Sequence, residues 1–153
     1  MARFDDKGHL YPYEVIEMTL QDFERFFVGG LEDKRHRREL FSNYLRFLEV
    51  LKKEFPFPFF QWIDGSFTTK KELPRDMDVV SFIAYDLFIK KPAAINYIAL
   101  NSKELYQVDA HFSTTASWRH GISGNVKKMK NTGGKFSVIH EKMKTASDTQ
   151  KAS

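Results

Sequence analysis

The stretch "WIDGSFTTKKELPRDMDVV", residues 62–80, joins two apolar segments of the chain. Gly65 and Ser66 follow the apolar residues at its start, and Asp76 and Asp78 precede the two valines at its end. Glycine allows a sharp turn and lets backbone N–H groups approach a phosphate closely, and a serine hydroxyl can donate to the same phosphate. The stretch therefore predicts two strands joined by a loop that could hold a phosphate.

The two aspartates are candidate metal ligands. Side chains alternate along a strand, so Asp76 and Asp78 would share one face, with about 6–7 Å between them. Carboxylates at this spacing can hold divalent cations, and Mg²⁺ combines a few carboxylates with substrate phosphate oxygens. Asp109, in the phase that would face the same way on a third strand, would complete a two-metal site. Alternatively, Gly65-Ser66 is an ordinary turn and the acids face solvent on an edge strand.

The flanking sequence predicts a small α/β domain. A capping pattern at Thr19 and a three- and four-residue apolar repeat from Leu40 to Leu51, including Leu45, are typical of helices. β-branched and aromatic runs are typical of strands. Helices are expected at about 19–28, 33–54 and 92–105, and strands at 59–63, 76–85 and 106–112. This order favours a small mixed sheet with helices packed mainly on one side, in the α/β (α+β) class.

The C-terminal part of the sequence is basic. Residues 119–153 hold eight basic and two acidic residues, a net charge of +6, whereas the first 118 residues sum to −2. "VKKMK" and "KFSVI" around "NTGG" could form a hairpin. We expect a single domain over residues 1–140 and a disordered basic tail over 141–153. The tail could attract nucleic acid or simply be solvated.

Composition excludes several classes of protein. With 42% hydrophobic residues, 15 of them Phe, the chain is too apolar for a disordered protein. It has no cysteine, which rules out disulfides, thiolate catalysis and cysteine-ligated zinc. The longest apolar runs fall short of the roughly 20 residues of a membrane span, and the N-terminus does not read as a secretory signal. We therefore expect a cytoplasmic protein with no membrane association.

Other charged and aromatic groups have alternative interpretations. "KRHRR", residues 34–38, could grip phosphates, but nearby acids favour a solvated helix face. His111 shares the expected face of Asp109 and could touch a phosphate, although a surface or packing role is favoured. Trp118 and Arg119 could stack on a base, but more often such a pair belongs to a core and its rim.

Residues 62–80 resemble the signature of the DNA polymerase beta-like nucleotidyltransferase superfamily. That signature is a hydrophobic residue, Gly-Ser, a spacer of about nine or more residues, and Asp-x-Asp between hydrophobic residues. The spacer from Phe67 to Arg75 is nine residues, which leaves little room for the helix that usually follows Gly-Ser. With the preceding "RRELFSNYLRFLEVL", the block is closest to a small bacterial and phage family of unknown function within the superfamily. The resemblance covers roughly residues 10 to 112.

The resemblance implies a role for each motif residue. Gly65 and Ser66 would bind nucleotide phosphates, Asp76 and Asp78 would ligate Mg²⁺ or Mn²⁺, and Asp109 would be the third carboxylate and accept a proton. The implied activity moves a nucleoside monophosphate from a nucleoside triphosphate to a hydroxyl on a protein, nucleic acid or small molecule.

Two other functions remain open from the sequence. Some small members of the superfamily are non-catalytic modules, so an antitoxin-like or defence-associated protein with a partner protein is the alternative. A basic nucleic-acid binder that uses the tail is the third.

Overall fold

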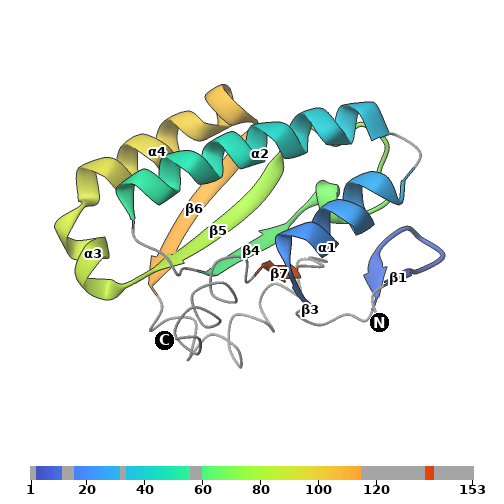
Figure 1. The fold of residues 1–153 in the computed structure, drawn as a ribbon, viewed down its shortest axis with the longest axis horizontal. Helices are drawn as coiled ribbons and strands as arrows, with labels where there is room; N and C mark the ends of the chain where they lie inside the picture. Colours follow the sequence, from blue (N-terminus) through green and yellow to red (C-terminus); the bar gives the residue numbers. More distant parts are fainter. Residues whose placement is uncertain (1–2, 12–15, 32–33, 56–59, 115–136, 140–153) are drawn as a thin grey trace, which may run out of the picture.

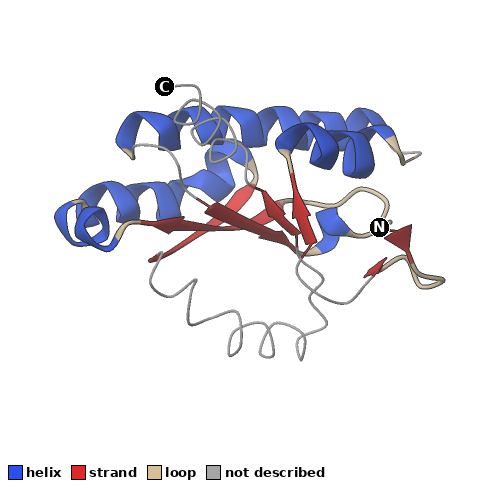
Figure 2. Ribbon diagram, turned by 60° about the horizontal axis from the view of Figure 1, so that its bottom comes forward, coloured by secondary structure: helices blue, strands red, loops and turns tan. Residues whose placement is uncertain are grey.

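The computed structural model describes residues 3–11, 16–31, 34–55, 60–114 and 137–139, which form a mixed α+β fold. Helices cover one face of a five-stranded sheet of order β3-β7-β4-β5-β6 (Figures 1 and 2). The strands of this sheet are β3 (Ile16–Met18), β7 (Ser137–Ile139), β4 (Phe60–Asp64), β5 (Met77–Ile83) and β6 (Val108–Thr114). Strands β1 (Arg3–Phe4) and β2 (Leu10–Tyr11) form a separate antiparallel pair.

The three strands of the signature region are neighbours in the sheet. β4 pairs antiparallel with β5, and β5 pairs parallel with β6. A parallel pair needs a crossover, which α3 (Tyr85–Lys90) and α4 (Pro92–Tyr106) supply. The end of β4 therefore meets the starts of β5 and β6 at one edge of the sheet.

The remaining helices begin and end largely where the sequence predicts. Thr19 caps α1 (Leu20–Glu24), because its Oγ1 accepts from the backbone N–H of Asp22 at 3.1 Å. The expected first helix continues as a π-helical turn, η1 (Arg25–Gly29), and the long helix α2 runs over Lys34–Glu54. α2 and α4 lie side by side over the sheet (Figure 1). None of the helices in the described ranges is long and apolar enough to cross a membrane.

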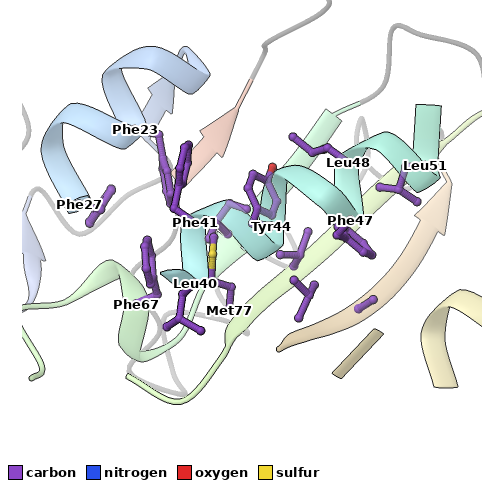
Figure 3. Packing of buried hydrophobic residues seen from close by; sticks show 14 of the residues in the cluster. Phe23, Phe27, Leu40, Phe41, Tyr44, Phe47, Leu48, Leu51, Phe67 and Met77 are labelled. Carbon is purple, nitrogen blue, oxygen red and sulfur yellow. The ribbon is translucent and has the colours of Figure 1, made fainter. Parts of the chain in front are cut away.

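The core lies between α2 and the helix-facing side of the sheet (Figure 3). Six residues of α2 are buried there besides Arg37: Leu40, Phe41, Tyr44, Phe47, Leu48 and Leu51. They pack with Met77 and Val79 of β5 and with Val108 and Ala110 of β6. Leu45, expected in the apolar stripe, is 37% exposed, and Phe47 is fully buried instead. The burial of each such large side chain contributes about 1.5–3 kcal/mol to the hydrophobic stabilisation.

A buried polar chain fixes the position of α2 over the sheet. The hydroxyl of Tyr44 donates to Oε1 of Gln61, and Nε2 of Gln61 donates to Oγ of Ser81 at 3.0 Å. Gln61 and Ser81 are also register partners in the β4–β5 pair. Because buried polar groups need their hydrogen bonds, a shift of α2 or a slip of this register would leave these groups unsatisfied.

Two expected segments differ from the structure. The strand expected over 76–85 ends at Ile83. Ala84, which is extended, precedes the short helix α3, which begins at Tyr85. β7, inside the expected "KFSVI" strand, pairs with β3 and β4. Both of its edges are thus taken by strands other than the hairpin partner predicted from the sequence. "VKKMK", Trp118, Arg119 and the predicted tail over 141–153 lie outside the described residues.

Candidate functional site

The turn after β4 brings the backbone against a carboxylate. Gly65 has φ +83°, and a Cβ at this position would lie 2.0 Å from Oδ2 of Asp78. No side chain fits there, so only glycine lets β4 end directly against Asp78. A short 3₁₀ turn, η2 (Ser66–Thr68), follows in place of a longer helix, as the short spacer predicts. The carbonyl of Gly65 accepts from the backbone N–H of Thr68 at 3.2 Å and from its Oγ1 at 3.0 Å, which closes the turn.

Three aspartates form a row across three neighbouring strands. Asp64 is the register partner of Asp78 in the β4–β5 pair, and Asp78 is the partner of Asp109 in the β5–β6 pair. Neighbouring strands lie about 4.8 Å apart, so these side chains are close. Asp76 stands two residues before Asp78 and shares its phase along the chain. We call these four residues, Asp64, Asp76, Asp78 and Asp109, the acidic edge.

Asp64 is a member of the acidic edge that the sequence interpretation missed. The signal was present, because an acid stands directly before Gly65-Ser66 at the end of an apolar strand. What the sequence did not provide was the antiparallel register that sets Asp64 opposite Asp78.

The central residue of the acidic edge has a raised pKa. The pKa of the Asp78 carboxyl is raised to about 6, first by burial and then by the charges of Asp76 and Asp109, a hydrogen bond with Asp109 and the charge of Asp64. Desolvation and like charges both disfavour the ionised form of a carboxyl group. A cation bound among these groups would relieve both costs.

Two cationic or potentially cationic side chains stand beside the acidic edge. Lys103 of α4 places Nζ 3.6 Å from Oδ2 of Asp76. His111 of β6 places Nε2 3.4 Å from Oδ1 of Asp109, on the face that the strand alternation predicted. These contacts show that Asp76 and Asp109 are accessible to cationic groups.

The acidic edge fits a hard divalent cation by its donor chemistry. Its side-chain donors are carboxylate oxygens, the ligands that Mg²⁺ and Mn²⁺ prefer. Over the ranges that the structure describes, however, no three His, Asp or Glu side chains converge on one ion-sized position. A bound cation would therefore require carboxylates of the acidic edge to reorient.

A cleft of about 410 Å³ opens beside the acidic edge. It is lined by Ser66, Lys71, Arg75, Asp76, Lys103 and Gln107. Three of these side chains are cations, and the serine is the one that the sequence assigned to phosphate binding. The volume of the cleft lies in the range of small-molecule sites, about 300–1,000 Å³. The cleft is thus suited to an anionic ligand that touches both the cations and Asp76.

Buried Arg37 holds the backbone of the loop that carries Lys71. Its guanidinium donates to the carbonyls of Phe27, Phe67, Thr69 and Lys71, at 3.1, 2.7, 2.6 and 2.8 Å. The sequence had favoured a solvated face for residues 34–38, and for Arg37 this prediction was wrong. The charge pattern of residues 34–38 could not show that the loop over residues 67–71, distant in sequence, would present its carbonyls to Arg37 of α2. Arg37 therefore fixes the backbone that carries Lys71 into the cleft.

The far end of the same loop is held from two helices. His36 of α2 contacts the carbonyl oxygen of Pro74 through Nε2. Gln107, which caps α4 with φ +54°, donates from Nε2 to the carbonyl of Arg75 at 3.2 Å and accepts from Met77 N–H at 2.9 Å. The position of Arg75 is thus set by contacts that also set the start of β5.

The structure brings the sequence-predicted site residues together. Gly65, Ser66, Asp76, Asp78 and Asp109 all lie at the edge where β4 ends and where β5 and β6 begin. Their roles in binding and catalysis stay predictions.

A known protein family matches most of the chain. A family described as "Family of unknown function (DUF6932)" matches residues 2–140, and the chain belongs to this family. No match was found among curated proteins or among solved structures.

Proposed function

We propose that this chain is a metal-dependent nucleotidyltransferase with a polymerase beta-like fold, which moves a nucleoside monophosphate from a nucleoside triphosphate to an acceptor hydroxyl. The observation that carries the proposal is the row of Asp64, Asp78 and Asp109 across three neighbouring strands. Like charges brought together and partly buried are unfavourable for folding. A function that uses the charges explains why the chain places them there.

The cleft beside the acidic edge supports the choice of a triphosphate. Lys71, Arg75 and Lys103 line it together with Ser66. The serine hydroxyl and the three cations would donate to phosphate oxygens, and charge-assisted hydrogen bonds of this kind are stronger than neutral ones. The turn at Gly65 would let backbone N–H groups approach the same phosphates. These residues would hold the phosphate chain close to Asp76.

The carboxylates would have different tasks in this reaction. Asp76 and Asp78 would hold Mg²⁺ or Mn²⁺, which when bound offsets charge on the phosphates and on the attacking oxygen. An oxygen of Asp109 would accept the proton of the acceptor hydroxyl, a role for which a carboxylate must lie within hydrogen-bond reach. The hydroxyl oxygen would then bond to the α-phosphorus as the bond from that phosphorus to the β-phosphate oxygen breaks, and pyrophosphate would leave. The acceptor hydroxyl would belong to a protein or a nucleic acid.

Two observations favour a non-catalytic alternative. Asp76 and Asp109 already pair with Lys103 and His111, and within the described part of the chain no three metal-binding side chains converge. A module of this kind would bind nucleotide, or a partner protein in a toxin–antitoxin or defence pair, without turnover. The absence of transfer despite triphosphate binding would identify it.

The test is a labelling experiment with the full chain. The protein, alone and with cell lysate, is incubated with each α-labelled ribonucleoside triphosphate and with Mg²⁺ or Mn²⁺. Label is followed on protein, RNA and small molecules. We expect transfer that requires the metal and is lost in Asp78→Asn. Tight triphosphate binding with no label on any acceptor would overturn the enzymatic proposal in favour of the binding module.

A further inference from the structure

Lys103 occupies a position between the two halves of the proposed site. It lies near the end of α4, and its Nζ pairs with Oδ2 of Asp76 at 3.6 Å. Both residues line the cleft that also holds Lys71 and Arg75. The Lys103 side chain is 66% exposed and that of Asp76 only 24%, so the lysine has the greater freedom to move.

We propose that Lys103 is a positioning residue that makes metal binding dependent on the triphosphate. Without nucleotide, Lys103 holds the Asp76 carboxylate. When a triphosphate enters the cleft, Lys103 exchanges Asp76 for a phosphate oxygen and leaves the carboxylate available to the metal. This inference rests on the proposed function and adds an order of binding to it.

The exchange is energetically reasonable because the ion pair is weak. Exposed ion pairs change an equilibrium constant by roughly fivefold or less. A triphosphate carries several negative charges and offers many acceptor oxygens, so it competes well for a flexible lysine. Lys103 needs only to rotate its long side chain within the cleft, and the backbone of α4 can stay in place.

The neighbouring cations differ from Lys103 in what they contact. Lys71 sits on the loop whose carbonyls Arg37 holds. The backbone of Arg75 is held by Gln107. The ion pair with Asp76 is made by Lys103, which alone of the three comes from a helix across the cleft. This difference makes Lys71 a matched control, because its removal takes one positive charge from the same cleft.

The test measures Mn²⁺ affinity by titration followed by electron paramagnetic resonance, which needs no turnover. The full-length parent, Lys103→Met, Lys103→Arg and Lys71→Met are each titrated alone and with a non-hydrolysable α,β-methylene triphosphate. Lys53→Met, at the exposed end of α2, controls for the loss of a distant charge. Thermal unfolding of each variant confirms that it is folded.

We expect the analogue to raise the Mn²⁺ affinity of the parent by about tenfold or more, because its phosphate oxygens add metal ligands and the release of Asp76 contributes up to roughly fivefold. Lys103→Met should bind Mn²⁺ alone about threefold more tightly than the parent and should gain less from the analogue. Lys103→Arg, which can keep the ion pair, should behave as the parent.

Three results would overturn the inference, and they separate its failure from that of the proposed function. If the parent binds metal and analogue together but the Mn²⁺ affinity of Lys103→Met is unchanged, the exchange of Lys103 is refuted and the proposed function is not. If Lys71→Met binds Mn²⁺ alone as tightly as Lys103→Met does, the change reflects the general charge of the cleft and not the specific pair between Lys103 and Asp76. If the parent binds no Mn²⁺ with or without the analogue, the metal site itself is absent and the proposed function fails too.

Discussion

The two faces of β5 differ in what they contribute to the protein. Met77 and Val79 are fully buried under α2, and they stabilise the fold without bearing on chemistry. Asp76 and Asp78 alternate with them and bring negative charge to the same edge of the sheet. At this end of the strand, one face therefore contributes to stability, and the other carries groups that raise the free energy of the folded state.

This difference explains why the fold can support the acidic edge. Buried apolar side chains and the Tyr44–Gln61–Ser81 chain fix the strands in register. That register alone then determines which carboxylates face one another. Substitutions on the two faces should have separable effects, and the following predictions use that separation, from the largest expected effect to the smallest.

The first prediction concerns the helix-facing side. Phe47→Ala should lower the free energy of unfolding by about 3–5 kcal/mol, because it removes a fully buried ring from the centre of α2. Urea denaturation followed by circular dichroism measures this loss. At a temperature where the variant is still folded, its Mn²⁺ affinity should match that of the parent. A large loss of metal affinity in the folded variant would mean that the two faces are not independent.

The second prediction concerns the row of carboxylates. Asp109→Asn should lower nucleotide transfer by a factor on the order of 10² or more, because an amide cannot accept the proton of the acceptor hydroxyl. Affinity for the Mg²⁺-triphosphate complex should stay within about tenfold of the parent. Initial rates with the α-labelled nucleotide and calorimetry measure the two quantities.

Full transfer by Asp109→Asn would assign the third acid elsewhere. Asp64 becomes the first candidate, because it borders Asp78 from the other side. Glu104 and Asp86 are weaker candidates. Glu104 is exposed on α4, and Asp86 follows the opposite end of β5.

The sequence predicted the elements whose pattern is local. The apolar repeat of α2 and the alternation in β6 are properties of adjacent residues, and they placed Phe41, Tyr44 and Asp109 on the observed faces. Thr19 and Pro92 marked helix starts for reasons of capping and missing N–H groups.

What the sequence did not predict depends on contacts between distant segments. The pairing of β7 with β3 and β4, the burial of Arg37 against loop carbonyls and the position of Asp64 opposite Asp78 are of this kind. α3 was missed because its residues continue the apolar composition of β5. The sequence therefore predicted most of the acidic edge, but it did not predict that Lys71, Arg75 and Lys103 would line one cleft beside it.

The third prediction tests the phosphate side of the site. Ser66→Ala should weaken triphosphate binding by about 1.5–3 kcal/mol, the usual contribution of a hydrogen bond to a charged group. Thermal stability should change little, because η2 is closed by the Gly65 carbonyl and the Thr68 side chain without the Ser66 hydroxyl. Calorimetry of the parent and the variant gives the affinities. Unchanged affinity in a well-folded variant would indicate that Ser66 is only a turn residue.

The last prediction concerns the charge of Asp78 in the absence of metal. The pKa of its carboxyl is raised from 3.8 to about 6, so the folded state holds this proton more tightly than the unfolded state. The resulting stabilisation is present in full below about pH 4 and is lost as the pH rises through about 6. We expect a loss of about 1 kcal/mol between pH 4.5 and 7.5, allowing for solvent screening at a half-buried group.

Asp78→Asn isolates this contribution from the other titrating groups. The amide cannot ionise, so the variant should be more stable than the parent at pH 7.5 without metal, and the difference should vanish towards pH 4. Thermal unfolding in a chelating buffer across this range gives both curves. Mg²⁺ should stabilise the parent at pH 7.5 and leave the variant less affected, because the ion offsets a charge that only the parent carries. Parallel pH profiles for the two proteins would mean that neither burial nor the neighbouring aspartates raise the pKa of Asp78 in solution, and the contrast between the two faces of β5 would then lie in packing alone.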